Sequence, residues 1–264
     1  MRLVRHHVLT GFAVLAFVYL LLPVAVVILF SFNAPKGRFN YLWEGFTFDY
    51  WRNWDAVPGI RDAVIVSLEI GLISTIVATV LGTLIALALV RHRFRGRGAT
   101  NMLIFLPMST PEIVLGASLL ALFLQSRVVT GFLTILVAHV MFIVSYVVVT
   151  VKARLINFDV HLEEAAMDLG ANGLTTFRKV TLPLLAPAIL SAALLGFALS
   201  IDDFVITYFV SGSETTFPLF VWGAARVSVP PQVNVIASAI FIVALLGMVI
   251  NILWQNRGAR RATA

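Results

Sequence analysis

A polar, charged interval between two long apolar runs contains the sequence Glu164-Ala165-Ala166-x3-Gly170-x9-Val180-x-Leu182-Pro183. The apolar runs on both sides are long enough to cross a bilayer, so the interval would lie at the membrane surface. Its two alanines are small enough to let another protein approach the backbone closely. We therefore predict a structured loop that a soluble partner holds.

The local sequence of this interval predicts a helix, a tight turn and a second helix. Asp159 is a suitable N-cap for a helix that ends at Leu169, and acidic side chains near its start suit the helix dipole. Gly170 is a natural stop, because glycine enters the left-handed region without steric cost. We expect a second short helix from residue 175 to residue 180, ended before Pro183, because a proline disfavours helix in the residue before it.

The composition indicates a membrane protein. Hydrophobic residues make up 60% of the sequence, charged residues 12%, and the mean hydropathy is +0.97. Soluble domains carry about 25% charged residues. This chain has too few polar residues to form a water-facing surface, so lipid must cover much of it. Cysteine is absent, which excludes disulfides, thiolate metal ligands and cysteine nucleophiles. The net charge of +6 is better explained by orientation in a membrane than by nucleic acid, so no nucleic-acid partner is expected.

Six apolar runs can each span a bilayer, which takes about 20 residues, and they predict an all-α, polytopic membrane protein. The runs are Leu9 to Phe32, Ala63 to Val90, Met102 to Leu124, Phe132 to Val151, Leu184 to Val210 and Val233 to Trp254. With the N-terminus in the cytoplasm, 13 of the 19 Lys and Arg residues fall on cytoplasmic segments and 6 on outer ones. This bias predicts that both termini are cytoplasmic. The first run is longer than a typical signal-peptide core, so we expect it to remain as a helix.

The longest outer segment, from Asn33 to Asp62, is rich in aromatic residues. Two interpretations stay open, and both can hold at once. The aromatics can lie at headgroup level, or they can form a docking surface for an external protein. They are Tyr41, Trp43, Phe46, Phe48, Tyr50, Trp51 and Trp54.

The spacing of the quoted interval resembles the EAA loop of bacterial ABC-importer permeases. Further segments are similar to the PotC-type permeases of spermidine/putrescine importers, and this similarity covers nearly the whole chain. The EAA loop is specific for ABC-importer permeases, whereas permeases for iron, thiamine and phosphonate share much of the remaining pattern. The segments are Arg91 to Gly98, Ser109 to Val114, Phe158-Asp159, Glu163 to Ala171, Leu199 to Phe204 and Val229 to Asn234.

The resemblance implies a type I ABC importer permease fold in the bacterial cytoplasmic (inner) membrane. Its partners would be a second permease subunit, two cytoplasmic ABC ATPase subunits and an external substrate-binding protein. We expect three parts: a first transmembrane helix and outer loop (1–62), a permease core (63–254) with the cytoplasmic EAA coupling loop at 152–183, and a basic cytoplasmic tail (255–264). The resemblance assigns ATPase coupling to Glu164, Ala165, Ala166, Gly170, Leu182 and Pro183.

The chain itself carries no nucleotide-binding or enzymatic signature. It has no Gly-x4-Gly-Lys-Ser/Thr motif, so ATP and Mg would be bound by the partner ATPases, and we expect no cofactor in this chain. It also has no His-Glu-x-x-His and no Gly-x-Ser-x-Gly, so we expect no catalytic residue and no metal site. His139 lies inside the fourth run, where we expect an interhelical hydrogen bond rather than contact with a substrate.

Acidic residues inside the apolar runs indicate a pathway, because a charge in a bilayer normally faces a cavity or a partner. Glu112 follows Pro111, and either satisfies backbone groups that the prolines free or lies on the pathway. Spacings of three and four would align Asp203 with a polar stripe on the fifth run, and such a stripe suits a cationic substrate. We expect Asp203 to face the pathway and Asp202 to support it. The candidate pathway residues are Asp203, Asp202, Glu112, Ser200 and Thr207.

The sequence therefore predicts a permease subunit that moves polyamines by alternating access, driven by ATP hydrolysis in partner subunits. The same machinery could instead move another solute, such as ferric iron or thiamine. An ion-coupled secondary transporter would leave the EAA spacing unexplained. A purely structural membrane subunit would leave the acidic residues of the fifth run unexplained.

Overall fold

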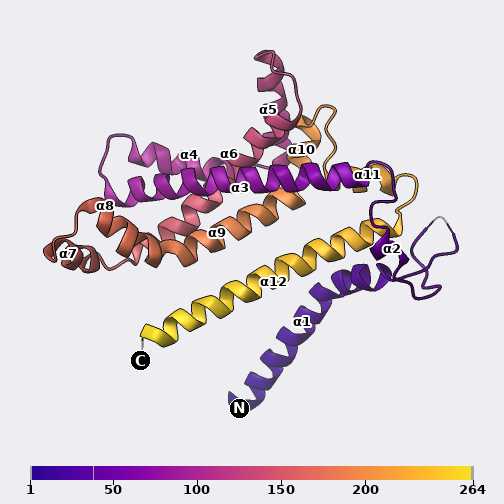
Figure 1. Ribbon diagram of the computed structural model, residues 1–264, viewed down its shortest axis with the longest axis horizontal. Helices are drawn as coiled ribbons and strands as arrows, with labels where there is room; N and C mark the ends of the chain where they lie inside the picture. The colour runs from indigo at the N-terminus through magenta and orange to yellow at the C-terminus, as the bar shows by residue number, and fades with distance from the viewer. Residues whose placement is uncertain (1, 38, 263–264) are drawn as a thin grey trace. The chain divides into compact units, whose positions relative to one another are not determined.

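The computed structural model describes residues 2–37 and 39–262, and the side chains of residues 9–37 and 39–250. Helices dominate the described chain (Figure 1). They are α1 (Arg2–Phe30), α2 (Asp49–Arg52), α3 (Ile60–Arg91), α4 (Arg97–Ser109), α5 (Glu112–Gln125), α6 (Phe132–Ile156), α7 (His161–Asp168), α8 (Gly173–Thr176), the π-helical turn η1 (Phe177–Thr181), α9 (Leu182–Asp202), α10 (Val205–Val210), α11 (Phe217–Ala225) and α12 (Pro231–Ala262).

The chain divides into two compact units. One comprises residues 1–61 and 220–246, and the other residues 62–219 and 247–264. Five helices are long and apolar enough to cross a membrane, and a bent pair, α4 with α5, would make a sixth crossing if it counts as one span. The expectation of a helical, polytopic membrane protein is confirmed.

In the unit that contains residues 62–219, α6 lies at the centre of the packing. It packs against α9, α4 and α10, and α10 packs against α5. Two buried apolar clusters join these helices. One brings α3, α6 and α9 together and the other joins α3, α5, α6 and α10. Their fully buried members include Leu89, Ile143, Val147, Leu185 and Ile206.

The α6–α9 contact depends on a glycine. A Cβ at Gly196 of α9 would lie 2.5 Å from Cγ2 of Ile143 on α6, closer than any real contact allows. Lipid is as apolar as the helix surfaces, so the hydrophobic effect does not hold membrane helices together. Small residues at a crossing let the helices approach closely and associate through van der Waals contacts instead. Gly196 therefore belongs to the packing of the bundle.

The sequence predicted one continuous span from Met102 to Leu124, but the structure has a break in it. This run forms α4 and α5, which meet at an angle of 109°. Thr110 and Pro111 have extended backbone conformations at the break, with ψ of 132° at both residues. The cause is the steric restriction that a proline places on the residue before it, whereas Pro107 lies inside α4 without ending it.

The run from Leu184 to Val210 is also broken. Helix α9 ends at Asp202, Asp203 is extended with ψ of 117°, and α10 begins at Val205. Pro23 lies inside α1 and does not end it. Helix α12 continues through most of the expected tail and ends at Ala262, while residues 263–264 lie outside the described part of the chain.

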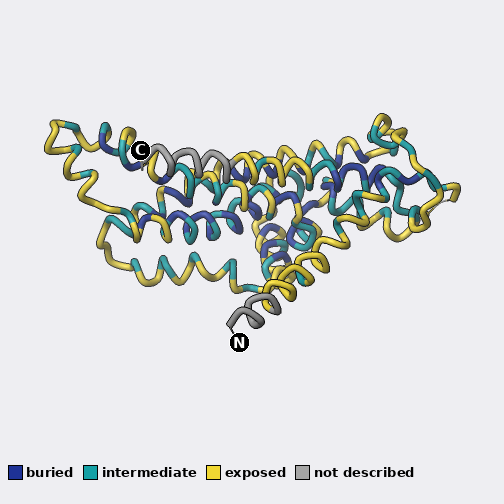
Figure 2. The backbone as a smooth tube through the Cα atoms, turned by 90° about the horizontal axis from the view of Figure 1, so that it is seen from below, coloured by how far each residue is buried: buried dark blue, intermediate teal, exposed yellow. Residues whose placement is uncertain are grey.

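The other unit contains α1 and the aromatic loop that follows it. Most residues of α1 from Leu9 onward are exposed (Figure 2). They include large apolar side chains such as Phe12, Phe17 and Tyr19, as a lipid-facing helix requires. The loop folds around Asn33, whose side chain is buried, donates to the Leu42 carbonyl and accepts the Glu44 N–H at 2.8 Å. Phe32 stacks on Phe46 and Trp51. Both interpretations of this loop, interfacial segment and docking surface, stay predictions.

Candidate functional site

The segment around Gly170 folds as the predicted helix, turn and helix. The Asp159 carboxylate accepts the His161 N–H at 3.1 Å in the turn that leads into α7, but the N-cap position is Val160, so the predicted N-cap lies one residue too early. Gly170 has φ of +88°, which confirms the expected left-handed stop. Asn172 then caps α8 by accepting the Thr175 N–H at 2.9 Å. Figure 1 shows α7 and α8 beyond one end of α3 and α9.

The second helix does not end before Pro183, so that expectation is wrong. Helices α8, η1 and α9 form one continuous apolar span from Gly173 to Asp202. In η1 the Leu182 N–H bonds to the Phe177 carbonyl, which is the wider spacing of a π-helix. A proline ring clashes with the carbonyl four residues earlier. The wide turn directly before Pro183 gives that ring room, so the chain continues as helix.

The tip of this element exposes both charged and apolar side chains. The Glu164 side chain is 58% exposed and lies 2.9 Å from Nδ1 of His161. This hydrogen bond, with the negative charge of the carboxylate, raises the pKa of His161. Leu169 is 91% exposed and Leu174 is 69% exposed. Exposed leucines beside a polar turn are typical of a surface that another protein covers.

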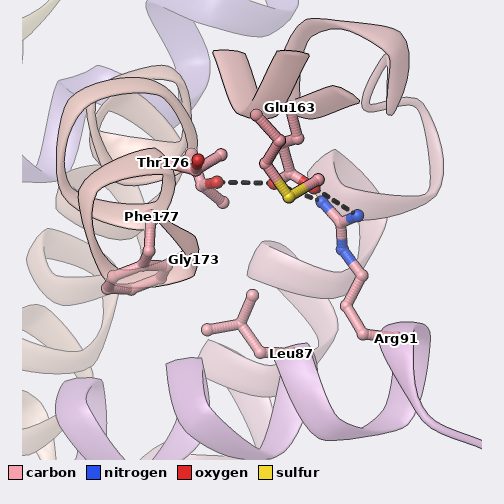
Figure 3. Close-up of a pocket in the computed structure, with 8 residues that line it drawn as sticks. Leu87, Arg91, Glu163, Gly173, Thr176 and Phe177 are labelled. Atoms are coloured by element: carbon pink, nitrogen blue, oxygen red, sulfur yellow. Dashed lines mark hydrogen bonds and ion pairs between the residues drawn. The ribbon is translucent and has the colours of Figure 1, made fainter. Parts of the chain in front are cut away.

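Glu163, which was not among the predicted residues, points away from this tip and back to the bundle (Figure 3). Both of its carboxylate oxygens contact the Arg91 guanidinium at the end of α3, at 2.8 and 2.7 Å. Thr181 of η1 donates to the same carboxylate, and the Arg91 guanidinium also lies over the Phe158 ring at 5.2 Å. No pattern in the sequence identified this pair, because its two members lie 72 residues apart in the chain.

A pocket of about 220 Å³ lies beside the Arg91–Glu163 pair. Apolar side chains of α3, α7 and η1 line much of its wall, and the ion pair forms the polar part (Figure 3). The Thr176 hydroxyl is buried and has no hydrogen-bond partner among the described residues. The interface between α7 and the rest of the bundle therefore has an ion pair on one side and an unfilled pocket on the other.

The break after α9 turns Asp203 into the protein. Its side chain is 6% exposed. The carboxylate accepts the Thr207 N–H at 2.8 Å and the Thr207 hydroxyl at 2.7 Å, so it caps the first turn of α10. A side chain that bonds nearby N–H groups in this way competes with continuation of the helix. The Asp203 side chain therefore has its partners inside the bundle rather than on a water-accessible stripe, and its place on the substrate pathway stays a prediction.

Ser200 and Thr207 belong to the same buried network rather than to an accessible stripe. His139 of α6 bonds Ser200 through Nδ1 at 2.6 Å and Thr207 through Nε2 at 2.9 Å. Ser200 in turn lies 3.2 Å from the Ser74 hydroxyl of α3. The expected interhelical hydrogen bonding of His139 is confirmed.

One donor in this network can be assigned by counting protons. Thr207 gives its only hydroxyl proton to Asp203, so in its bond with His139 it accepts from Nε2–H. Nδ1 of His139 bonds the Ser200 hydroxyl, which also lies 3.2 Å from the Ser74 hydroxyl, and Ser74 donates to the Gly71 carbonyl at 3.3 Å. A chain of hydrogen bonds therefore connects four helices and ends on the Asp203 carboxylate.

Asp202 and Glu112 are the acids left accessible at the two breaks. Asp202 is the last residue of α9 and is exposed, and Glu112 is the first residue of α5 and is exposed. A Cβ at Gly116 of α5 would lie 2.6 Å from the Phe209 ring of α10. This contact places the α4–α5 bend and the α9–α10 break in the same region of the bundle. Neither carboxylate has a hydrogen bond or ion pair among the described residues.

Comparison with known sequences identifies the relatives of this chain. Residues 78–261 match the family described as binding-protein-dependent transport system inner membrane component. The spermidine/putrescine transport system permease protein PotC of Haemophilus influenzae is 38% identical over 248 residues, which cover 94% of this chain and 96% of that protein. The putrescine transport system permease protein PotI of Escherichia coli K12 is 38% identical over 248 residues, 91% of this chain and 87% of that protein.

Solved structures agree on the fold. A bacterial ABC transporter involved in the import of alginate has a TM-score of 0.67 at 14% identity, covering 98% of this chain and 97% of that chain. An amino acid ABC transporter has a TM-score of 0.59 at 18% identity, covering 80% and 100%. At these identities the likeness shows the fold alone. The sequence match extends over most of the chain, and the chain therefore belongs to the binding-protein-dependent transport system inner membrane components, as a membrane-spanning permease subunit of an ABC importer.

Proposed function

We propose that this permease subunit carries polyamines such as spermidine and putrescine, and that ATP is hydrolysed by partner subunits. The observation that carries this proposal is the match over nearly its whole length to permeases named for spermidine and putrescine. Transport proceeds by alternating access between the chain and a second permease subunit. An external binding protein delivers the substrate, and two ABC ATPases bind ATP and Mg²⁺.

The ATPases dock on α7 and the turn that follows it. Glu164, Ala165 and Ala166 lie on α7, and Gly170 fixes the turn after it. The exposed Leu169 and Leu174 supply apolar contact area at the tip. Leu182 and Pro183 begin α9, so they connect the docking element to a membrane span rather than contact the ATPase through the tip.

The substrate pathway passes the two helix breaks. Discontinuous membrane helices form substrate sites in other transporters because their free ends present charge and unpaired backbone groups. The C-terminal end of α9 carries the negative pole of its dipole, and the Asp202 carboxylate adds to it. Both favour a cation. Glu112 is exposed at the N-terminal end of α5 and adds a second acidic side chain near the same region.

The orientation follows from the distribution of Lys and Arg. Of the 19 Lys and Arg residues, 8 lie in segments 91–97 and 152–179 around α7 and α8, and 5 more lie in the two terminal segments. Basic residues accumulate on the cytoplasmic side of membrane proteins, so this distribution favours a cytoplasmic location for α7 and both termini, where ATP is available. The aromatic loop after α1 then faces outward, in reach of the external binding protein.

The test is the ATPase activity of the purified complex in lipid nanodiscs. The complex contains this chain, its second permease, the ATPases and the binding protein. Spermidine or putrescine should stimulate hydrolysis, whereas thiamine and ferric iron should not. Stimulation by thiamine or ferric iron with no response to either polyamine would refute the polyamine assignment and leave the permease class unaffected. Failure of the ATPase subunits to assemble with this chain would refute the proposal that partner ATPases drive its transport.

A further inference from the structure

We infer that movement of the ATPase-docking helix α7 is transmitted to the membrane spans through the Arg91–Glu163 ion pair. The inference rests on the proposed function, because it takes α7 as the element that the ATPases move. It assigns a positioning role to two residues that the EAA pattern does not include.

Two successive acids of α7 have different surroundings. Glu164 is exposed at the tip, where an ATPase would meet it, whereas the Glu163 side chain is only 14% exposed. Neighbouring residues on a helix lie about 100° apart around its axis, so one turn of α7 can contact the ATPase through Glu164 and the bundle through Glu163.

Arg91 offers a rigid anchor for α7. It is the last residue of α3, and the turn before it is held in the core by Leu89, which is 1% exposed among α6 and α9 side chains. Its guanidinium contacts both Glu163 oxygens and also covers the Phe158 ring. A planar guanidinium held at two oxygens resists rotation as well as separation. Displacement of α7 therefore moves the end of α3 with it.

Glu163 also contacts the second span of this end. Thr181 donates to its carboxylate from η1, the π-helical turn that leads directly into α9. Single π-turns inside helices occur often at functional sites, because their looser hydrogen bonds allow local change of register. One carboxylate thus connects α7 to α3 and to α9, which ends in the proposed pathway at Asp202.

An exposed ion pair would not support this role, since water and salt screen such pairs and they contribute little. The Arg91–Glu163 pair differs from them in three respects. Its side chains are only 24% and 14% exposed, and the guanidinium contacts both carboxylate oxygens. In addition, the Thr181 hydroxyl donates a hydrogen bond to the same carboxylate. A pocket of about 220 Å³ adjoins the pair, so packed side chains do not fill this space between α7 and the end of α3.

The experiment measures spermidine uptake and ATP hydrolysis in the same proteoliposomes and takes their ratio. The variants are Arg91→Gln, Glu163→Gln and the exchange Arg91→Glu with Glu163→Arg. Arg93→Gln is the matched control, an exposed arginine two residues further along. Coupling energies of 1–3 kcal/mol correspond to about 5- to 150-fold. We expect each single variant to retain its bound ATPase subunits and to hydrolyse ATP at the wild-type rate. The amount of spermidine taken up per ATP hydrolysed should fall on the order of tenfold. The exchange should recover most of the ratio, and Arg93→Gln should equal the wild type.

Wild-type uptake per ATP in both single variants would overturn the inference. So would loss of the ATPases from the purified single variants, because the pair would then serve assembly alone. An exchange variant that stays uncoupled would overturn the ion pair as the basis of transmission. Failure of the proposed docking is distinguishable, since Gly170→Val would then transport normally whatever the Arg91 and Glu163 variants do.

Discussion

Asp202 and Asp203 are neighbouring residues of the same chemistry that the end of α9 places in opposite environments. Asp202 is exposed without a partner in the described structure, and Asp203 is buried with Thr207 and His139. A carboxylate against lipid is costly, about 2.5–3.5 kcal/mol at a helix centre on insertion scales. The exposed Asp202 is therefore explained by a pathway or a partner subunit, whereas Asp203 is explained by the bundle itself.

The two substitutions to asparagine should separate these roles. Asp202→Asn should leave assembly and thermal stability unchanged and reduce spermidine uptake by about tenfold or more, because one charge pair near 4 Å contributes several kcal/mol at an effective dielectric of about 20. Asp203→Asn should lower stability by about 1–3 kcal/mol, since a charged acceptor of two hydrogen bonds is lost. Glu69→Gln, an exposed acid of α3, is the control. Normal uptake by Asp202→Asn would remove that residue from the pathway.

At the scale of elements, the break between α9 and α10 is held by the hydrogen-bond chain that ends at Asp203. Two isosteric substitutions test it. Thr207→Val removes the hydroxyl that bonds both His139 and Asp203 and should destabilise the protein by about 1–3 kcal/mol. Thr75→Val removes a buried hydroxyl for which the described residues offer no partner, and should change stability by less than about 0.5 kcal/mol. The midpoints of thermal unfolding in detergent give the comparison, and equal shifts would show that the chain does not hold the break.

The turn after α7 gives a second test at this scale. Gly170 has φ of +88° and no atom within 4 Å of its missing Cβ, so Gly170→Val adds backbone strain of about 1–2 kcal/mol and no clash. Insertion should persist, while ATPase binding and uptake should fall. The control is Gly173→Ala in α8, where the Cβ would also meet open space and the backbone φ is not positive. If both variants bind the ATPases and transport as the wild type does, the turn is not the docking element.

The sequence predicted the spans and the Gly170 turn because both are local signals of hydropathy and backbone sterics. It did not predict which prolines interrupt helices. Pro107 and Pro183 lie within helices, and Pro111 follows a break, because packing and a wide turn decide how each ring is accommodated. Hydropathy likewise could not detect the break at Asp203.

Side-chain partners were unpredictable for a related reason. The pattern singled out Glu164, yet its neighbour Glu163 forms the ion pair, with an arginine 72 residues earlier in the chain. Asp203 was expected to face water because its helix was taken as continuous and isolated. His139, more than 60 residues earlier, supplies the partner that turns it inward. Contacts of this range follow from the packing of helices and not from spacing along one of them.

For the whole molecule, the proposed orientation can be tested with single cysteines, because the chain has none of its own. Tyr41→Cys in the aromatic loop and Leu174→Cys in α8 both replace exposed side chains. In intact cells an impermeant thiol reagent should label Tyr41→Cys only, and permeabilised cells should label both. Labelling of Leu174→Cys in intact cells would reverse the orientation and remove α7 from the ATP side.

The large exposed apolar surface also belongs to this scale. Leucine, valine and phenylalanine side chains of α1, α3 and α12 remain exposed in the isolated subunit, while the buried clusters join only part of the bundle. Lipid can cover such a surface, and a second permease subunit would cover part of it. The subunit alone is therefore half of the proposed pathway.

The most direct test of the central claim is uptake of labelled spermidine into proteoliposomes that contain the complete complex. ATP is supplied on the ATPase side, and ionophores dissipate all ion gradients. We predict uptake that requires ATP hydrolysis, continues with ionophores present and is lost when this chain is left out. Uptake that persists without ATP and stops when the gradients collapse would contradict the account.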